Sequence, residues 1–158
     1  QGISAANGMA LSAKLDGKDY KVYSILGDGE LEEGQVWEAA MFAAHYKLDN
    51  LTAFVDFNGL QIDGNITDVM NPTPIDEKFK AFGWNSVVID GNDFDEIARA
   101  VELAKKSDKP FAIVAKTTKG KGVSFMENKC EWHGAAPNDE QYEIGMKDLE
   151  QIELCLNK

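Results

Sequence analysis

The sequence has little cysteine, little positive charge and no long apolar run. Cys130 and Cys155 are its only cysteines, and they lack metal-ligand spacing, which argues against a disulfide framework or a zinc site and leaves two free thiols. With 16 Lys and Arg against 27 Asp and Glu, the net charge is −11, so neither nucleic acid nor an anionic lipid surface is an expected partner. No apolar run could span a membrane, and the first residues do not resemble a secretory signal, so we expect a cytoplasmic protein without membrane association.

The chain has 158 residues, 44% of them hydrophobic, which suffices for a single domain over residues 1–158 with a real core. Apolar, β-prone runs predict strands over residues 21–26, 50–57, 85–90 and 111–115. Apolar spacings of three and four predict helices over residues 3–15, 33–46, 75–82, 93–106 and 138–156, with a loop at 65–74. This alternation predicts an α/β fold, a three-layer sandwich in which a mainly parallel sheet is flanked by helices on both faces.

Two of the predicted helices have a marked apolar side. In the helix over 93–106 the inward residues should be Phe94, Ile97, Ala98, Val101, Leu103 and Ala104. In the final helix the apolar side consists of Tyr142, Ile144, Gly145, Leu149 and Ile152.

Two polar loops directly follow predicted strands. Gly27-Asp28-Gly29 ends the strand over 21–26, and Asn58-Gly59-Leu60 ends the strand over 50–57. A Gly-Asp-Gly tripeptide alone is often only a turn. Asp28 and Asn58, however, lie 30 positions apart with a helical pattern between them, so neighbouring parallel strands would bring both side chains to one edge of the sheet. Their hard oxygen donors suit Mg²⁺ or Ca²⁺, which predicts a cation and diphosphate site.

The residues around these loops resemble the thiamine diphosphate motif of transketolases. The matching positions are Gly27-Asp28-Gly29, Glu33-Gly34, Trp37-Glu38-Ala39, Asp56, Asn58, Gln61 and Gly64. The tail agrees, since residues 116–122 and the run Trp132-His133-Gly134-Ala135-Ala136-Pro137 are similar to the close of the same domain. The opening, residues 1–10, looks like the helix after the family's glycine-rich phosphate loop, so the resemblance extends to about Asn138.

The resemblance implies an N-terminal, diphosphate-binding domain of a transketolase. It assigns Mg²⁺, with Ca²⁺ as an alternative, to the side chains of Asp28 and Asn58 and the carbonyl of Leu60. It implies that His133 lies near both the diphosphate and the reacting end of the substrate. The implied thiamine diphosphate contacts are Gly27, Asp28, Gly29, Glu30, Asn58, Leu60, Ile62 and His133.

Three further groups have both a structural and a functional interpretation. Glu33 and Glu38, near the start of a predicted helix, would ordinarily be surface acids that favour the helix dipole. The resemblance instead assigns them a catalytic role in a chain of acidic groups at a subunit interface. A lone histidine is usually structural, but His133 lies in the matching segment and is predicted to be catalytic. The lysine-rich segment 116–122 lacks the order of a P-loop, which argues against an ATPase.

The chain lacks other parts of such an enzyme. The glutamate that activates the cofactor lies, in the resembled family, in a separate pyrimidine-binding domain or C-terminal subunit. Family members also carry roughly a hundred residues before the position of Gln1. We therefore expect a fragment of a transketolase, or of a split enzyme's N-terminal subunit, that is inactive alone and works in a dimeric or heterotetrameric assembly. Its substrates would be sugar phosphates, and its place the pentose phosphate pathway.

Two alternatives stay open. One is a related enzyme, a deoxyxylulose-phosphate synthase or a dehydrogenase subunit of the same superfamily, although Trp37-Glu38-Ala39 and the His133 segment fit a transketolase better. The other is a non-catalytic binding or scaffold module that keeps the fold.

Overall fold

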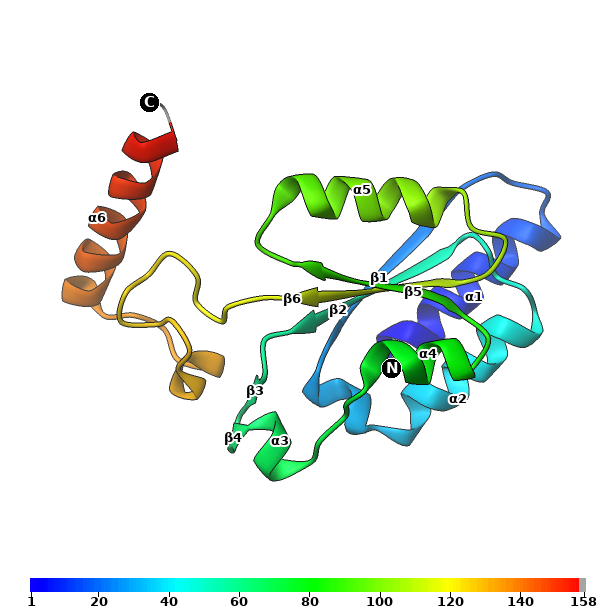
Figure 1. Ribbon diagram of the computed structural model, residues 1–158, viewed down its shortest axis with the longest axis horizontal. Helices are drawn as coiled ribbons and strands as arrows, with labels where there is room; N and C mark the ends of the chain where they lie inside the picture. The colour runs from blue at the N-terminus through cyan, green and yellow to red at the C-terminus, as the bar shows by residue number, and fades with distance from the viewer. Residues whose placement is uncertain (157–158) are drawn as a thin grey trace.

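The protein is built on one parallel four-stranded sheet. The computed structural model describes residues 1–156. The strands are β1 (Val22–Gly27), β2 (Leu51–Phe57), β5 (Asn85–Asp90) and β6 (Phe111–Lys116). Their order in the sheet is β1-β2-β6-β5, and every neighbouring pair is parallel (Figure 1). The predicted α/β class and parallel sheet are confirmed.

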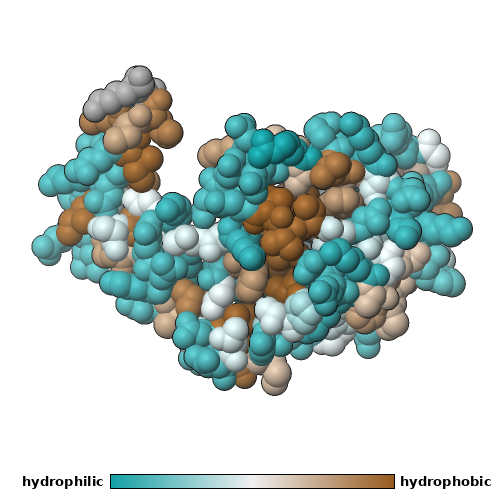
Figure 2. All heavy atoms as spheres, in the orientation of Figure 1, coloured by the Kyte–Doolittle hydropathy of each residue, from teal (hydrophilic) through white to brown (hydrophobic). Residues whose placement is uncertain are grey.

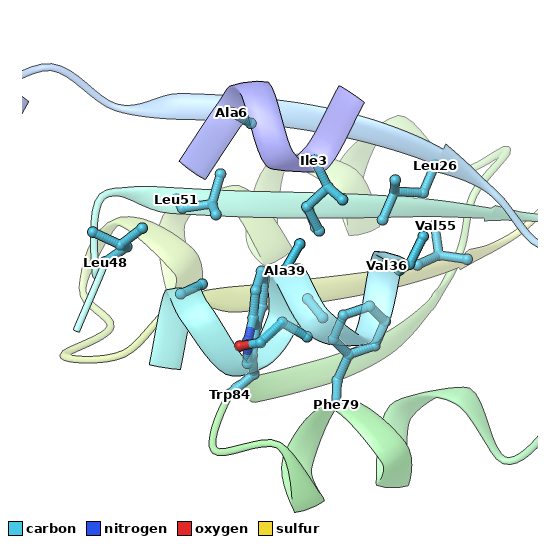
Figure 3. Close-up of a cluster of buried hydrophobic side chains, with 14 of the residues drawn as sticks. Ile3, Ala6, Leu26, Val36, Ala39, Leu48, Leu51, Val55, Phe79 and Trp84 are labelled. Atoms are coloured by element: carbon cyan, nitrogen blue, oxygen red, sulfur yellow. The ribbon is translucent and has the colours of Figure 1, made fainter. Parts of the chain in front are cut away.

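Helices cover both faces of the sheet, which confirms the three layers. Helices α1 (Gly2–Leu15), α2 (Gly34–His45) and α4 (Ile75–Ala81) lie on one side, and α5 (Phe94–Lys105) lies on the other (Figure 1). The larger core cluster joins α1, α2 and α4 to the sheet, with Ile3, Val36 and Phe79 pointing toward one another (Figure 3). A smaller cluster lies between α5 and strands β5 and β6. Apolar burial on both faces therefore fixes the sheet at the centre.

Local signals explain where several of these elements begin and end. Asp93 precedes α5, and its carboxylate accepts hydrogen bonds from the N–H groups of Asp95 (2.8 Å) and Glu96 (3.1 Å), as expected of a helix N-cap. Gly83, with φ of +90°, turns the chain out of α4 and into β5. Next to it, the buried Trp84 donates from Nε1 to the carbonyl of Ala40 at 2.9 Å, which ties the start of β5 to α2.

The predicted inward face of α5 is only partly right. Ala100 and Ala104 are buried, and Ile97 and Val101 pack against the same cluster. Phe94 is instead 87% exposed and Leu103 is 54% exposed, and Ala98 is also exposed. The helix presents one face with spacings of three and four to the sheet, so residues at intermediate angles turn to solvent although they are apolar.

The final helix, α6 (Asp139–Leu156), stands apart from the sheet, beyond the irregular segment over 117–137 (Figure 1). Of its predicted apolar side only Gly145 is buried, against Val123 and Phe125 of that segment. The other four residues of this apolar side are between 42% and 55% exposed, namely Tyr142, Ile144, Leu149 and Ile152.

Five short elements were not expected from the sequence. They are the 3₁₀ turns η1 (Gly29–Glu32) and η2 (Cys130–His133), the hairpin of β3 (Leu60–Gln61) and β4 (Gly64–Asn65), and the helical turn α3 (Ile66–Val69). The last lies inside residues 65–74, which were predicted as a loop throughout.

The face seen in Figure 2 is mostly hydrophilic, with apolar side chains gathered between α5 and α4. Strand β5 forms this edge of the sheet, and its Val88 is 41% exposed. Within residues 1–156, no helix combines the length and the apolar character needed to cross a bilayer.

Candidate functional site

A cavity of about 440 Å³ lies at the carboxyl edge of the sheet, where β1 and β2 end. Its walls come from the loops after both strands, from the segment after β6 and from η2. All eight residues predicted to contact thiamine diphosphate line it. The lining residues are Gly27, Asp28, Gly29, Glu30, Asp56, Asn58, Leu60, Gln61, Ile62, Lys119 and His133.

Asp28 is the buried charged group of this cavity, with a relative exposure of 2%. Its carboxylate accepts hydrogen bonds from the N–H of Gly29 at 2.9 Å and from the N–H of Gly59 at 2.6 Å. Burial raises the pKa of Asp28, the two N–H groups oppose that rise, and the nearby charge of Asp56 adds to it. The carboxylate is thus held in place in an environment that disfavours its charge.

The loop after β1 is locked by its own side chains. Asp28 begins η1, and the Glu30 carboxylate accepts a hydrogen bond from the N–H of Gly27 at 3.2 Å. The Gln61 side chain donates to Glu32 at 2.7 Å, which joins η1 to β3. These contacts hold the loop after β1 against the loop after β2.

Asn58 follows β2, and both the nitrogen and the oxygen of its side-chain amide form hydrogen bonds. Nδ2 donates to Asp56 Oδ2 at 3.3 Å, and Oδ1 accepts from the N–H of Leu60 at 3.0 Å. Asp56 is the register partner of Gly27 on β1, and its carbonyl accepts a hydrogen bond from the Asp28 N–H at 3.2 Å. The parallel register therefore brings Asp28 and Asn58 together, as predicted.

These groups offer the donors that a hard divalent cation prefers: a carboxylate from Asp28, an amide oxygen from Asn58 and a backbone carbonyl from Leu60. Within residues 1–156 no cluster of three or more His, Cys, Asp or Glu side chains could hold a metal by itself. A cation here would need further oxygens, such as those of a diphosphate. Two neighbouring carboxylates, one of them buried, also create a negative site that a cation would offset, so the residues fit Mg²⁺ and a diphosphate.

His133 lies at the end of η2, lines the cavity and is exposed. The turn is held by Trp132, whose Nε1 donates to the carbonyl of Phe125 at 3.0 Å and whose ring lies 5.1 Å from the Phe125 ring. The mouth of the cavity therefore carries an imidazole that is free to meet a bound molecule.

Lys119 lines the same cavity and was not singled out from the sequence. The only sequence feature that pointed to Lys119 was the lysine-rich run over residues 116–122. Its other two lysines, Lys116 and Lys121, line a larger cavity of about 740 Å³ at the ends of β5 and β6, which contains none of the predicted site residues. Lys119 therefore adds a positive charge where a diphosphate would lie.

Glu33 and Glu38 are not part of this cavity. Both are exposed at the beginning of α2, and the Glu33 side chain forms no capping hydrogen bond there. Glu38 lines a separate groove of about 320 Å³ between α1 and α2, together with Asn7 and Phe42. Their predicted place in a subunit interface agrees with this exposure and stays a prediction.

Relatives of known function match almost the whole chain. One is a 6-deoxy-6-sulfo-D-fructose transketolase subunit of a Clostridium strain, 46% identical over 152 residues. Another is one of the subunits of an apulose-4-phosphate transketolase from Phocaeicola vulgatus, 43% identical over 154 residues. Both matches cover 96% of this chain and 55% of the relative. Human transketolase is 44% identical over 142 residues, which cover 85% of this chain and 21% of that protein.

The fold agrees with these matches. The crystal structure of transketolase from Campylobacter jejuni superimposes with a TM-score of 0.88 at 36% identity, over 92% of this chain and 24% of that one. The chain thus spans about half of the subunits that it matches and about a quarter of this complete enzyme. The family described as the thiamine diphosphate binding domain of transketolase matches residues 1–150, and the chain belongs to this family.

Proposed function

We propose that this chain is the Mg²⁺- and diphosphate-binding part of a transketolase. In a complete assembly it would transfer two-carbon ketol units between sugar phosphates. The observation that carries this proposal is the convergence of Asp28 and Asn58 on one cavity, tied together by the Gly59–Asp28 hydrogen bond, with Lys119 and His133 lining the same cavity.

Each group would have a distinct task toward the cofactor. Asp28, Asn58 and the Leu60 carbonyl would hold Mg²⁺, and Lys119 would lie beside the diphosphate charge. Thiamine diphosphate, when bound, supplies the chemistry that breaks and forms carbon–carbon bonds. The exposed imidazole of His133 would exchange a proton with a substrate oxygen at the mouth of the cavity.

A partner would complete the site. The two similar proteins from Clostridium and Phocaeicola are named as subunits of transketolases, which supports a partner that carries the pyrimidine-binding domain. Glu33 and Glu38, exposed beside the groove between α1 and α2, would contact that partner or a second copy in a dimeric or heterotetrameric assembly. The chain alone would bind cofactor weakly and turn over no substrate.

Two hydrogen-bond donors at the cavity and the names of the relatives support a substrate class. Lys119 and His133 offer donors to an anionic sugar. The names of the two similar proteins contain a sulfonated and a phosphorylated sugar. We propose sugar phosphates for this chain.

Two measurements on the assembled enzyme test the proposal. Thiamine diphosphate binding, followed calorimetrically, should require Mg²⁺ and should be lost in Asp28→Ala; unchanged Mg²⁺-dependent binding in this variant would contradict the assignment. Product analysis should show ketol transfer from xylulose phosphate. Condensation of pyruvate would instead indicate a deoxyxylulose-phosphate synthase, and cofactor binding without any turnover would indicate a scaffold.

A further inference from the structure

One carboxylate at the centre of the cavity has no part in the proposed cation ligand set. Asp56 is the last residue but one of β2, and it lines the cavity. Its Oδ1 accepts a hydrogen bond from the hydroxyl of Thr117, the residue after β6. Its Oδ2 accepts from Nδ2 of Asn58 at 3.3 Å. Both oxygens of Asp56 are therefore occupied by protein donors.

These bonds determine which end of the Asn58 amide faces the cation site. In the observed orientation, Nδ2 meets an acceptor on Asp56 and Oδ1 meets a donor on Leu60. If the amide were reversed, its NH₂ group would face the N–H of Leu60 and its oxygen would face the Asp56 carboxylate. Both contacts would be repulsive. Because a carbonyl oxygen has two lone pairs, Oδ1 keeps one for a cation while it accepts from Leu60.

Thr117 in turn holds Asp56 from a third strand. The Thr117 N–H donates to the carbonyl of Phe57 at 3.1 Å, so its backbone is fixed beside the end of β2. The hydroxyl then reaches the Asp56 carboxylate across a separation of 61 residues in the sequence. The link ties the second half of the chain to the loop that presents Asn58.

We propose that Asp56, held by the Thr117 hydroxyl, is a positioning residue that keeps the Asn58 amide oxygen directed at the Mg²⁺ site. This inference rests on the proposed function, because it concerns the same cation. Removal of the Thr117 hydroxyl frees the Asp56 carboxylate to rotate and releases Nδ2 of Asn58. The expected result is a cation affinity about 10-fold lower, the low end of the range for disturbing the hydrogen-bond partner of a metal ligand, because the Thr117 hydroxyl holds Asp56 and Asp56 accepts from the proposed ligand Asn58.

The test measures Mn²⁺ affinity by electron paramagnetic resonance in the assembled enzyme with thiamine diphosphate present. Thr117→Val and Thr117→Ala should each weaken Mn²⁺ binding about 10-fold, and Thr117→Ser, which keeps the hydroxyl, should restore it to within about twofold. Thr118→Val is the matched control, because within the described residues the Thr118 side chain makes no hydrogen bond. Thr117→Ala keeps the test valid if the bulkier valine disturbs folding.

The outcomes separate this inference from the proposed function. If the unmodified enzyme binds no Mn²⁺ with the cofactor, both fail. If it binds Mn²⁺ and Thr117→Val behaves like Thr118→Val, the positioning role is overturned and the cation site stands. The melting temperature without cation provides a further readout: a purely structural role would lower it in the Thr117 variants and leave Mn²⁺ affinity unchanged, which also overturns the proposal.

Discussion

The N–H of Gly59 donates a 2.6 Å hydrogen bond to the buried carboxylate of Asp28, across 31 positions of the chain. The bond joins the loops after β1 and β2. Gly59 has φ of +76°, a conformation that glycine adopts without strain. The proposed cation site therefore depends on a backbone donor that only this conformation aims at Asp28.

We expect Gly59→Ala to lower stability by about 1–2 kcal/mol, because an alanine in the left-handed region is strained. Relaxation of that strain would turn the N–H away from Asp28, so Mg²⁺ affinity should also fall. Gly17→Ala is the matched control, since Gly17 has φ of +63° and lies before β1, at the other end of the sheet. It should lose similar stability in thermal unfolding with no change in Mg²⁺ affinity; equal loss of affinity in both variants would contradict the prediction.

Stabilisation by Mg²⁺ should depend on pH through Asp28. Its pKa is raised in the folded protein, so without cation its contribution to the free energy of unfolding is greatest below the ordinary value of 3.8 and falls as the pH rises through the raised pKa. A bound cation would offset the negative charge that Asp28 gains as the pH rises through its raised pKa. The increase in melting temperature on adding Mg²⁺ and cofactor should thus be largest near neutral pH and decline on acidification, beginning above pH 3.8.

Asp28→Asn, which has no such charge, should show little Mg²⁺-dependent stabilisation at any pH. An equal increase in melting temperature at pH 7 and near the ordinary pKa would be inconsistent with this account.

Gly91→Ala should disturb the hydrogen bond between Thr117 and Asp56, although Gly91 itself takes no part in that bond. A Cβ at Gly91 would lie 2.5 Å from Thr117 Cγ2 and 2.8 Å from the Cβ of Ala115, so Thr117 must shift. We expect a loss of about 1–3 kcal/mol from overpacking and a lower Mg²⁺ affinity. Gly8→Ala, where the added Cβ meets open space within a helix, should instead gain roughly 0.5–1 kcal/mol and leave Mg²⁺ affinity unchanged. Chemical denaturation combined with Mg²⁺ titration checks both variants.

His133→Ala should reduce the turnover number of the assembled enzyme by about 100-fold, the scale of a lost proton-transfer group. Because His133 is exposed, stability should change by less than about 0.5 kcal/mol. The other histidine of the chain, His45, ends α2 against the edge of Tyr46 and is absent from the cavity lining. His45→Ala should retain full turnover, and equal losses in the two variants would remove His133 from the mechanism.

Local sequence was enough to place the two polar loops at one edge of the sheet. The strands before Asp28 and Asn58 are apolar and alternate with helices, and parallel strands end at the same edge. This is why the convergence of these two side chains could be predicted. The transketolase resemblance added Leu60, Ile62 and His133, all of which line the cavity.

Apolar periodicity was less informative about which faces are covered. Phe94 and Leu103 were expected inside and lie in solvent. The spacing of apolar residues shows that a helix has a side to bury, while burial depends on what packs against it. On α6, Tyr142 and Ile152 remain 55% and 43% exposed within residues 1–156.

The sequence by itself determined the fold class, the family and the pair of candidate oxygen ligands, because each depends on strand ends, helix spacing or a short local motif. Only the tertiary structure decided that Lys119, rather than Lys116 or Lys121, lines the cavity. Only the tertiary structure showed that the Thr117 hydroxyl donates a hydrogen bond to Asp56, which also accepts one from Asn58. Both findings depend on the path of the chain after β6. That path is set by contacts between residues about 60 positions apart in the sequence, and no local sequence pattern encodes such contacts.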